Sequence, residues 1–161
     1  MKRLFLALIL TVVSSLSYAQ GLEPGTDLPK AVFYKTDGKI FSTDQIPKGK
    51  KSLIMFFDAT CEHCQRVGAH LSKKTAELGK VNIYLVTQDE PQSIDYYVNK
   101  YAKPLAALKN VTILRDKDRV FIPLFHPRQF PSLYLFGPER KLTFFSSNEK
   151  DVDKFLKLIN P

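Results

Sequence analysis

The feature that most constrains the fold is a buried-strand pattern that ends just before two cysteines. Residues 52–57 are Ser-Leu-Ile-Met-Phe-Phe, an apolar run whose length is typical of a central β-strand covered on both faces. Cys61 and Cys64, the only cysteines in the chain, follow within one short loop. Beyond them, Val67 and Leu71 repeat at helical spacing. The sequence therefore predicts a strand, a short loop and a helix that begins at the first cysteine.

Strand and helix patterns flank this unit on both sides. We expect a hairpin of residues 31–34 and 39–41, further strands at 81–87, 111–114, 132–136 and 142–145, and helices at 62–78, 91–102 and 148–159. The Asp37-Gly38 pair is a strong signal for the hairpin turn, and Gly79 is the expected stop of the first helix. Residues 116–127 contain two prolines and are expected to be an irregular connection. The order strand, helix, strand, helix predicts one α/β domain.

The first residues have the pattern of an exported protein. Two basic residues precede the apolar run 4–13, and small residues surround the position before Gln20, which is typical of a secretory signal peptide. The run is shorter than the roughly 20 residues that a membrane span needs. We expect a signal peptide at residues 1–19, a single domain at residues 20–161, a periplasmic or secreted location, and no membrane span after cleavage. A retained N-terminal anchor is the alternative.

The distribution of charge bears on the class of partner. The chain has a formal net charge of +8, but its lysines are spread along the sequence instead of forming a dense block with interleaved aromatic residues. Such a pattern is typical of a solvated surface, so we expect no nucleic-acid partner.

The spacing of the two cysteines indicates redox chemistry. A bridge from Cys61 to Cys64 closes a very short loop and would add little stability, and a secreted domain that depended on disulfides would carry several pairs. At the start of a helix, the peptide dipole and the free backbone N–H groups favour a thiolate at Cys61. We therefore expect Cys61 to attack a substrate disulfide and Cys64 to resolve the mixed disulfide. The reverse steps would oxidise a substrate.

The two residues between the cysteines affect the direction of exchange in opposite senses. His63, when protonated or donating a hydrogen bond, would stabilise the thiolate, whereas the negative charge of Glu62 would oppose it. The sequence does not rank these two effects, and the alternative for His63 is an exposed residue without redox influence. Of the other histidines, His70 is expected to be structural, and His126 lies in a loop between two prolines.

Another proline precedes an alternating strand. Pro131 stands immediately before residues 132–136, and by frequency alone its peptide bond would be trans. If the bond were cis and lay opposite Cys61, the backbone of Phe130 would be exposed for pairing with an extended substrate segment.

These features together resemble the thioredoxin superfamily, and more narrowly its exported TlpA-like and redoxin-type members. The likeness rests on a strand ending in Phe-Phe, Cys-x-x-Cys at a helix start, and Pro131 before a β-hairpin and a C-terminal helix. It implies a thioredoxin-like three-layer sandwich, with a central mixed sheet flanked by helices. It also implies protein-disulfide oxidoreductase activity without cofactor or metal, in which Cys61 attacks, Cys64 resolves, and a cis Pro131 with Phe130 shapes the substrate groove.

Several positions depart from the family pattern. Family members usually have Trp where this chain has Thr60, and many have a buried acid where it has Met55 or Val67. The proton acceptor for Cys64 is therefore unassigned, and Asp58 and Glu62 are the candidates.

Other departures concern the reaction. A peroxiredoxin is disfavoured, since such enzymes require Thr three residues before the reactive cysteine, where this chain has Asp58. His63 is shared with disulfide oxidants and isomerases, whereas the remaining architecture is closer to the reductases. The direction of exchange stays open, with a slight lean to reduction.

The expected partners are protein thiols or disulfides outside the cytoplasm. Since no membrane segment is expected after cleavage, turnover would need a separate electron donor or acceptor in the membrane. One alternative is a Sco-like copper-binding metallochaperone with Cys61, Cys64 and a distant histidine such as His126 as ligands, although Sco-type sites have three residues between their cysteines. The other alternative is a redox-inert thioredoxin-like binding module.

Overall fold

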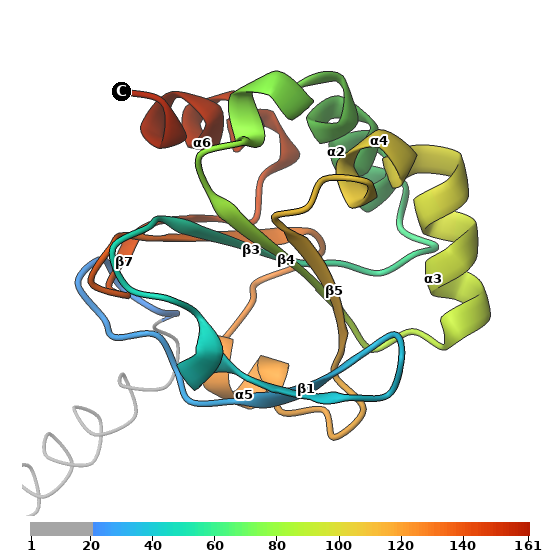
Figure 1. Ribbon diagram of the computed structural model, residues 1–161, viewed down its shortest axis with the longest axis horizontal. Coiled ribbons are helices and arrows are strands. Elements are labelled where there is room, and N and C mark those ends of the chain that lie inside the picture. Colours follow the sequence, from blue (N-terminus) through green and yellow to red (C-terminus); the bar gives the residue numbers. More distant parts are fainter. Residues whose placement is uncertain (1–20) are drawn as a thin grey trace, which may run out of the picture.

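Seven strands form one mixed sheet in the computed structural model, which describes residues 21–161 (Figure 1). The predicted signal peptide and its cleavage site lie outside the described residues. The strands are β1 (Val32–Lys35), β2 (Ile40–Ser42), β3 (Ser52–Phe56), β4 (Asn82–Thr87), β5 (Val111–Arg115), β6 (Ser132–Phe136) and β7 (Leu142–Ser146). Their order is β2-β1-β5-β4-β3-β6-β7, and β3, β4 and β5 are parallel, whereas the remaining pairs are antiparallel.

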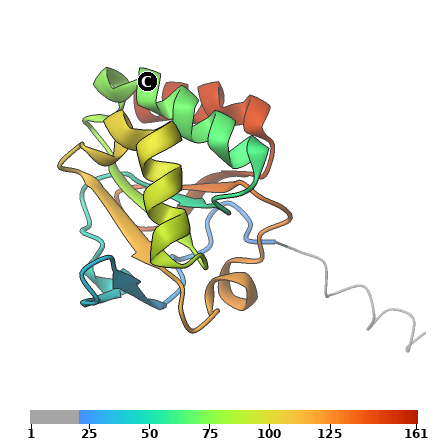
Figure 2. The same ribbon diagram turned by 90° about the vertical axis from the view of Figure 1, so that its right-hand side faces the viewer.

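Helices cover both faces of this sheet, as Figures 1 and 2 show. The helices are α2 (Glu62–Lys73), α3 (Pro91–Tyr97), α4 (Lys103–Ala106), α5 (Phe121–Phe125) and α6 (Val152–Ile159). A π-helical turn, Val98–Ala102, joins α3 to α4, and 3-10 turns lie at Thr43–Gln45, Thr75–Leu78 and Glu149–Asp151. On one face lie α2, α3, α4 and α6; on the other lies α5, against which the β1–β2 end of the sheet packs. The expected thioredoxin-like sandwich is confirmed.

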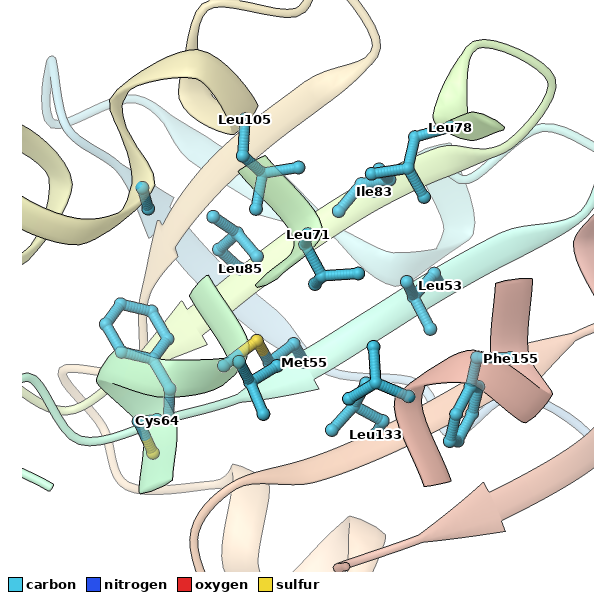
Figure 3. Close-up of a cluster of buried hydrophobic side chains, with 14 of the residues drawn as sticks. Leu53, Met55, Cys64, Leu71, Leu78, Ile83, Leu85, Leu105, Leu133 and Phe155 are labelled. Atoms are coloured by element: carbon cyan, nitrogen blue, oxygen red, sulfur yellow. The ribbon is translucent and has the colours of Figure 1, made fainter. Parts of the chain in front are cut away.

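Strand β3 contributes to the core on both of its faces. Leu53 and Met55 join the cluster under α2 and α6, whereas Ile54 and Phe56 join the cluster under α5. Figure 3 shows part of the first cluster, with side chains of the sheet facing Leu71 of α2. Because each fully buried side chain of this size contributes about 1.5–3 kcal/mol, β3 is a strongly anchored place from which a loop can leave the sheet.

The first predicted helix is shorter than expected. α2 ends at Lys73, and Lys74 leaves the helical region at φ −114° and ψ 22°. A 3-10 turn over residues 75–78 then buries Leu78 completely. Gly79 has φ −63°, so it is not the left-handed helix stop that its position suggested. The regular helix therefore ends about one turn earlier than its spacing predicted, and the 3-10 turn completes the segment.

The irregular connection expected at residues 116–127 is wrong in part, because it contains α5. The aromatic rings of this helix stack on one another and on a ring of β3. The ring centroid of Phe121 lies 4.1 Å from that of Phe125 and 4.2 Å from that of Phe56. The Asp116 carboxylate accepts the backbone N–H groups of the first turn at 2.9 and 3.1 Å. Pro123 is tolerated because the N–H groups of a first helical turn have no partner within the helix. Tertiary packing therefore forms a helix that local patterns did not indicate.

The other two helices differ from the prediction only in their details. The helix expected at 91–102 consists of α3 and the π-helical turn, and the helix expected at 148–159 begins as a 3-10 turn. Within residues 21–161, no helix has the length and apolar character that crossing a membrane requires.

Gly68 provides a test of the contact between α2 and α3. A Cβ atom at this position would lie 2.4 Å from Oη and 2.9 Å from Cζ of the buried Tyr97. Although Ala normally stabilises a helix relative to Gly, we expect Gly68→Ala to lower the free energy of unfolding by about 1–3 kcal/mol in urea denaturation, through overpacking. Gly79→Ala is the control, because nothing lies within 4 Å of its Cβ position, and it should change stability by less than about 0.5 kcal/mol. Equal effects at both positions would contradict this account of the contact.

Candidate redox site

The loop between β3 and α2 is held by carboxylates that follow two neighbouring strands. The Asp58 carboxylate accepts the backbone N–H of Thr60 at 2.7 Å and that of Cys61 at 3.2 Å. The Asp89 carboxylate, which follows β4, accepts the backbone N–H of Ala59 at 2.7 Å. Parallel strands bring these carboxyl ends to the same edge of the sheet. Cys61 is thereby fixed as the residue that precedes the first turn of α2.

The two cysteines differ in their exposure. Cys61 is half-buried and Cys64 is completely buried, and both are free thiols. Burial raises the pKa of the Cys64 thiol, and the neighbouring Cys61 adds to this effect; a backbone hydrogen bond from Asp58 opposes it. Cys64 therefore keeps its proton at neutral pH, while Cys61 is the sulfur that a second molecule can reach.

The peptide bond between Phe130 and Pro131 is cis and lies beside the first cysteine. Cys61 Sγ donates to the Phe130 carbonyl oxygen at 3.9 Å. The Phe130 ring is held against Phe56 of β3, with ring centroids 4.9 Å apart. Ser132 fixes the other end of this loop, since its hydroxyl donates to the Gln129 carbonyl at 2.7 Å. The structure thus brings together Cys61, Phe130 and Pro131, three of the residues singled out in the sequence.

The residues between the cysteines point to solvent and toward charged groups. The Glu62 carboxylate lies 3.6 Å from Arg66 and its side chain is 83% exposed. His63 Nδ1 lies 2.8 Å from Arg66 Nη2 and 3.0 Å from Glu149 Oε1. Hydrogen bonding to Arg66 lowers the pKa of Glu149, and His63 contributes in the same direction. The contact with Glu149 lies outside any local pattern, because 86 residues separate it from His63 in the sequence.

Of the two candidate proton acceptors for Cys64, Asp58 lies close enough for its charge to contribute to the raised pKa of that thiol. One of its carboxylate oxygens, Oδ1, accepts the N–H groups of its own loop, whereas Glu62 faces Arg66. The buried polar group next to Cys64 is Tyr97, whose hydroxyl donates to the Cys64 carbonyl at 3.0 Å. Burial raises the pKa of Tyr97, so its hydroxyl holds its proton and positions the first turn of α2. Tyr97 was not predicted from the sequence, because an aromatic residue on a helix is first interpreted as part of the core.

The copper alternative lacks a third ligand in the part of the chain that the structure describes. Residues 21–161 contain no group of three or more His, Cys, Asp or Glu side chains arranged to hold a metal ion. His126 ends α5 with a left-handed backbone and is exposed. His70 instead contacts Asp153 of α6 through a 2.8 Å hydrogen bond.

Comparison with known proteins agrees with this geometry. The model of the AhpC/TSA family matches residues 24–145. The chain belongs to the AhpC/TSA family. A search of curated proteins finds no match.

Solved structures extend this family assignment to the fold. The thioredoxin domain of a thiol-disulfide oxidoreductase from Bacteroides vulgatus has a TM-score of 0.66 and 19% identity, covering 86% of this chain and 99% of that chain. A secreted disulfide oxidoreductase of Mycobacterium tuberculosis, homologous to E. coli DsbE, has a TM-score of 0.64 and 19% identity. The match covers 80% of this chain and 95% of that chain. A peroxiredoxin-like protein from Aquifex aeolicus has a TM-score of 0.67 and 14% identity. The match covers 87% of this chain and 89% of that chain. At these identities the likeness shows a shared thioredoxin-like fold, to which this AhpC/TSA member belongs.

The difference in burial and protonation between the cysteines can be measured by alkylation. In the reduced protein at about pH 7, we expect iodoacetamide to modify Cys61 at least about tenfold faster than Cys64, because only a thiolate that the reagent can reach reacts. Peptide mass spectrometry separates the two products. The protein unfolded in urea is the control, and there the two rates should converge. Preferential modification of Cys64 in the folded protein would contradict the assignment.

Proposed function

We propose that this protein is an exported thiol-disulfide oxidoreductase. Its Cys61/Cys64 dithiol undergoes thiol-disulfide exchange with disulfides of substrate proteins outside the cytoplasm. The observation that carries the proposal is the position of Cys61: half-buried, at the start of α2, and 3.9 Å from the Phe130 carbonyl beside a cis proline. Buried Cys64 lies one helical turn further on. These positions supply an accessible nucleophile, a protected resolving thiol and, at half-buried Phe130, a backbone carbonyl beside the nucleophile; Pro131 itself is buried.

The reaction follows from this arrangement. The Cys61 thiolate attacks one sulfur of a substrate disulfide, and the other substrate sulfur leaves as a thiolate and takes up a proton from solvent. Cys64 then loses its proton and attacks Cys61 Sγ, which breaks the mixed disulfide and releases the second substrate thiol. Two electrons have passed to the substrate, and the bridge between Cys61 and Cys64 remains. The two sulfurs carry the whole reaction, so the proposal includes no cofactor.

We propose reduction as the direction and a separate dithiol protein in the membrane as the electron donor. The support for reduction is architectural: the segments around the site follow the DsbE-like and TlpA-like pattern over most of the chain. Export is supported by the signal-peptide pattern at residues 1–19 and by a neighbour described as secreted. The proposed partners are therefore protein disulfides in the periplasm or outside the cell, and neither nucleic acid nor a membrane-spanning segment has a part in the proposal.

Peroxide reduction is the second candidate, because a peroxiredoxin-like protein and a thiol peroxidase from Chromobacterium violaceum are among the structural neighbours. The residue three positions before Cys61 opposes it here. Asp58 places a carboxylate against the loop that carries the nucleophile, and it accepts hydrogen bonds there instead of offering a hydroxyl to a peroxide oxygen.

The direction of exchange is tested by the reduction potential. Equilibration of the bridge in glutathione buffers at pH 7, followed by thiol labelling, should give a value near that of thioredoxin, about −270 mV. A value near about −120 mV would identify an oxidant and would overturn the proposed direction.

Two substitutions test the roles of the cysteines. Cys61→Ser should reduce insulin-disulfide reduction by roughly a hundredfold or more, because the nucleophile is lost. Cys64→Ser should instead trap mixed disulfides between Cys61 and substrate proteins. The double variant is the control and should trap none. Retained insulin reduction in Cys61→Ser would refute the proposal, and rapid peroxide consumption that survives in Cys64→Ser would favour the peroxidase.

A further inference from the structure

His63, inside the Cys-x-x-Cys segment, lies between two side chains of opposite charge. Arg66 comes from the next turn of α2, and Glu149 comes from the 3-10 turn that precedes α6. The arginine and the carboxylate form a two-point pair: Nε to Oε2 at 2.9 Å and Nη2 to Oε1 at 3.1 Å. His63 Nδ1 lies beside one of these two contacts, 2.8 Å from Arg66 Nη2 and 3.0 Å from Glu149 Oε1.

His63 Nδ1 cannot form hydrogen bonds with Arg66 and with Glu149 at the same time. A guanidinium has only donors, so Arg66 bonds Nδ1 when that nitrogen carries a lone pair, in the neutral ring. A carboxylate has only acceptors, so Glu149 bonds Nδ1 when that nitrogen carries a proton, in the cation. Arg66 remains charged throughout, and its hydrogen bonds keep Glu149 ionised where histidine titrates. The neighbours therefore favour opposite protonation states of the same ring.

The other charged or titratable side chains around this group come from the same two segments: Glu62 and His70 from α2, and Lys150 and Asp153 from the 3-10 turn and α6. Glu62, on the same helix, lies 3.6 Å from Arg66 and is mostly in solvent, and Lys150 follows Glu149 on the turn. The remaining charge is the one that Cys61 carries when it acts as a thiolate, which only the reduced protein can form. Cys61 lies two residues before His63, and its charge acts on Arg66. Of all these charges, it alone changes during disulfide exchange.

We propose that Arg66 and Glu149 are positioning residues that make His63 take up a proton when the Cys61/Cys64 bridge is reduced. In the oxidised protein the neutral ring accepts from Arg66. When the bridge receives two electrons, Cys64 takes one proton and Cys61 becomes a thiolate; His63 takes a second proton from solvent and donates it in a hydrogen bond to Glu149. Oxidation by a substrate disulfide releases both protons. This inference rests on the proposed function, since it needs exchange at Cys61.

The chain carries a matched pair that lacks the redox partner. His70, seven residues after His63 on α2, bonds Asp153 at 2.8 Å, and Asp153 lies four residues after Glu149. Both pairs therefore join α2 to the α6 segment through a histidine and a carboxylate. Asp153→Asn removes the same kind of contact at a distance from the cysteines.

The test is an NMR titration of the histidine ring signals in oxidised and reduced protein. In the unmodified chain, we expect the titration midpoint of His63 to be higher in the reduced form by about half to one pH unit, because a nearby thiolate favours the cation. Arg66→Gln should raise the midpoint in both forms, since it removes a repelling cation and frees Glu149. Glu149→Gln should lower it in both forms and reduce the difference between them by at least half. Asp153→Asn should change the titration midpoint of His70 and leave that of His63 unchanged.

A second measurement separates redox tuning from support of the fold. The equilibrium constant with glutathione, followed from pH 5.5 to 8.5, should change its pH dependence in Glu149→Gln and stay parallel to the unmodified chain in Asp153→Asn. Equal His63 midpoints in the two redox states, or equal effects of the two substitutions, would overturn the inference while exchange itself continued. Failure of the bridge to equilibrate with glutathione would instead overturn the proposed function, and the titrations of the reduced variants would still report on Arg66 and Glu149.

Discussion

Burial of β3 on both faces is the constraint on which the rest of the structure depends. Its side chains anchor two clusters, one under α2 and α6 and one under α5, so the end of the strand has little freedom to move. Each buried side chain contributes about 1.5–3 kcal/mol, against roughly 1–2 kcal/mol for fixing the backbone of one residue. The loop that follows starts from this fixed point, and Asp58 and Asp89 hold it until α2 begins. The position of Cys61 is in this sense a consequence of core packing.

Local patterns were sufficient for the parts of the fold that rest on local chemistry. The apolar run of β3, the turn at Gly38 and the helical spacing after Cys64 each carry their own signal, and the structure contains all three elements. α5 was missed because its stability comes from stacking on Phe56 and from the Asp116 carboxylate. Neither contact is visible from the five residues of the helix itself.

The candidate site likewise contains residues that local patterns indicated and residues that only distant contacts bring to it. Cys61 and Cys64 were recognisable by their spacing and Pro131 by its place before a strand, and the resemblance added the expectation of a cis bond at Pro131. Contacts from distant segments gave no such signal: Glu149 reaches the site from the turn before α6, and Tyr97 from the end of α3. Long-range partners of this kind become visible only once the sheet has brought the helices together (Figure 2).

The close approach of Tyr97 to Gly68 has a consequence for how sequences of this kind can diverge. The phenol group of Tyr97 occupies the space that a side chain at position 68 would need, and its hydroxyl donates a hydrogen bond to the carbonyl of Cys64. A larger residue at position 68 fits without overpacking only when position 97 becomes smaller, and the hydrogen bond to the Cys64 carbonyl is then lost. The two positions are therefore expected to change together among relatives, and a relative that keeps the pair keeps the geometry behind its second cysteine.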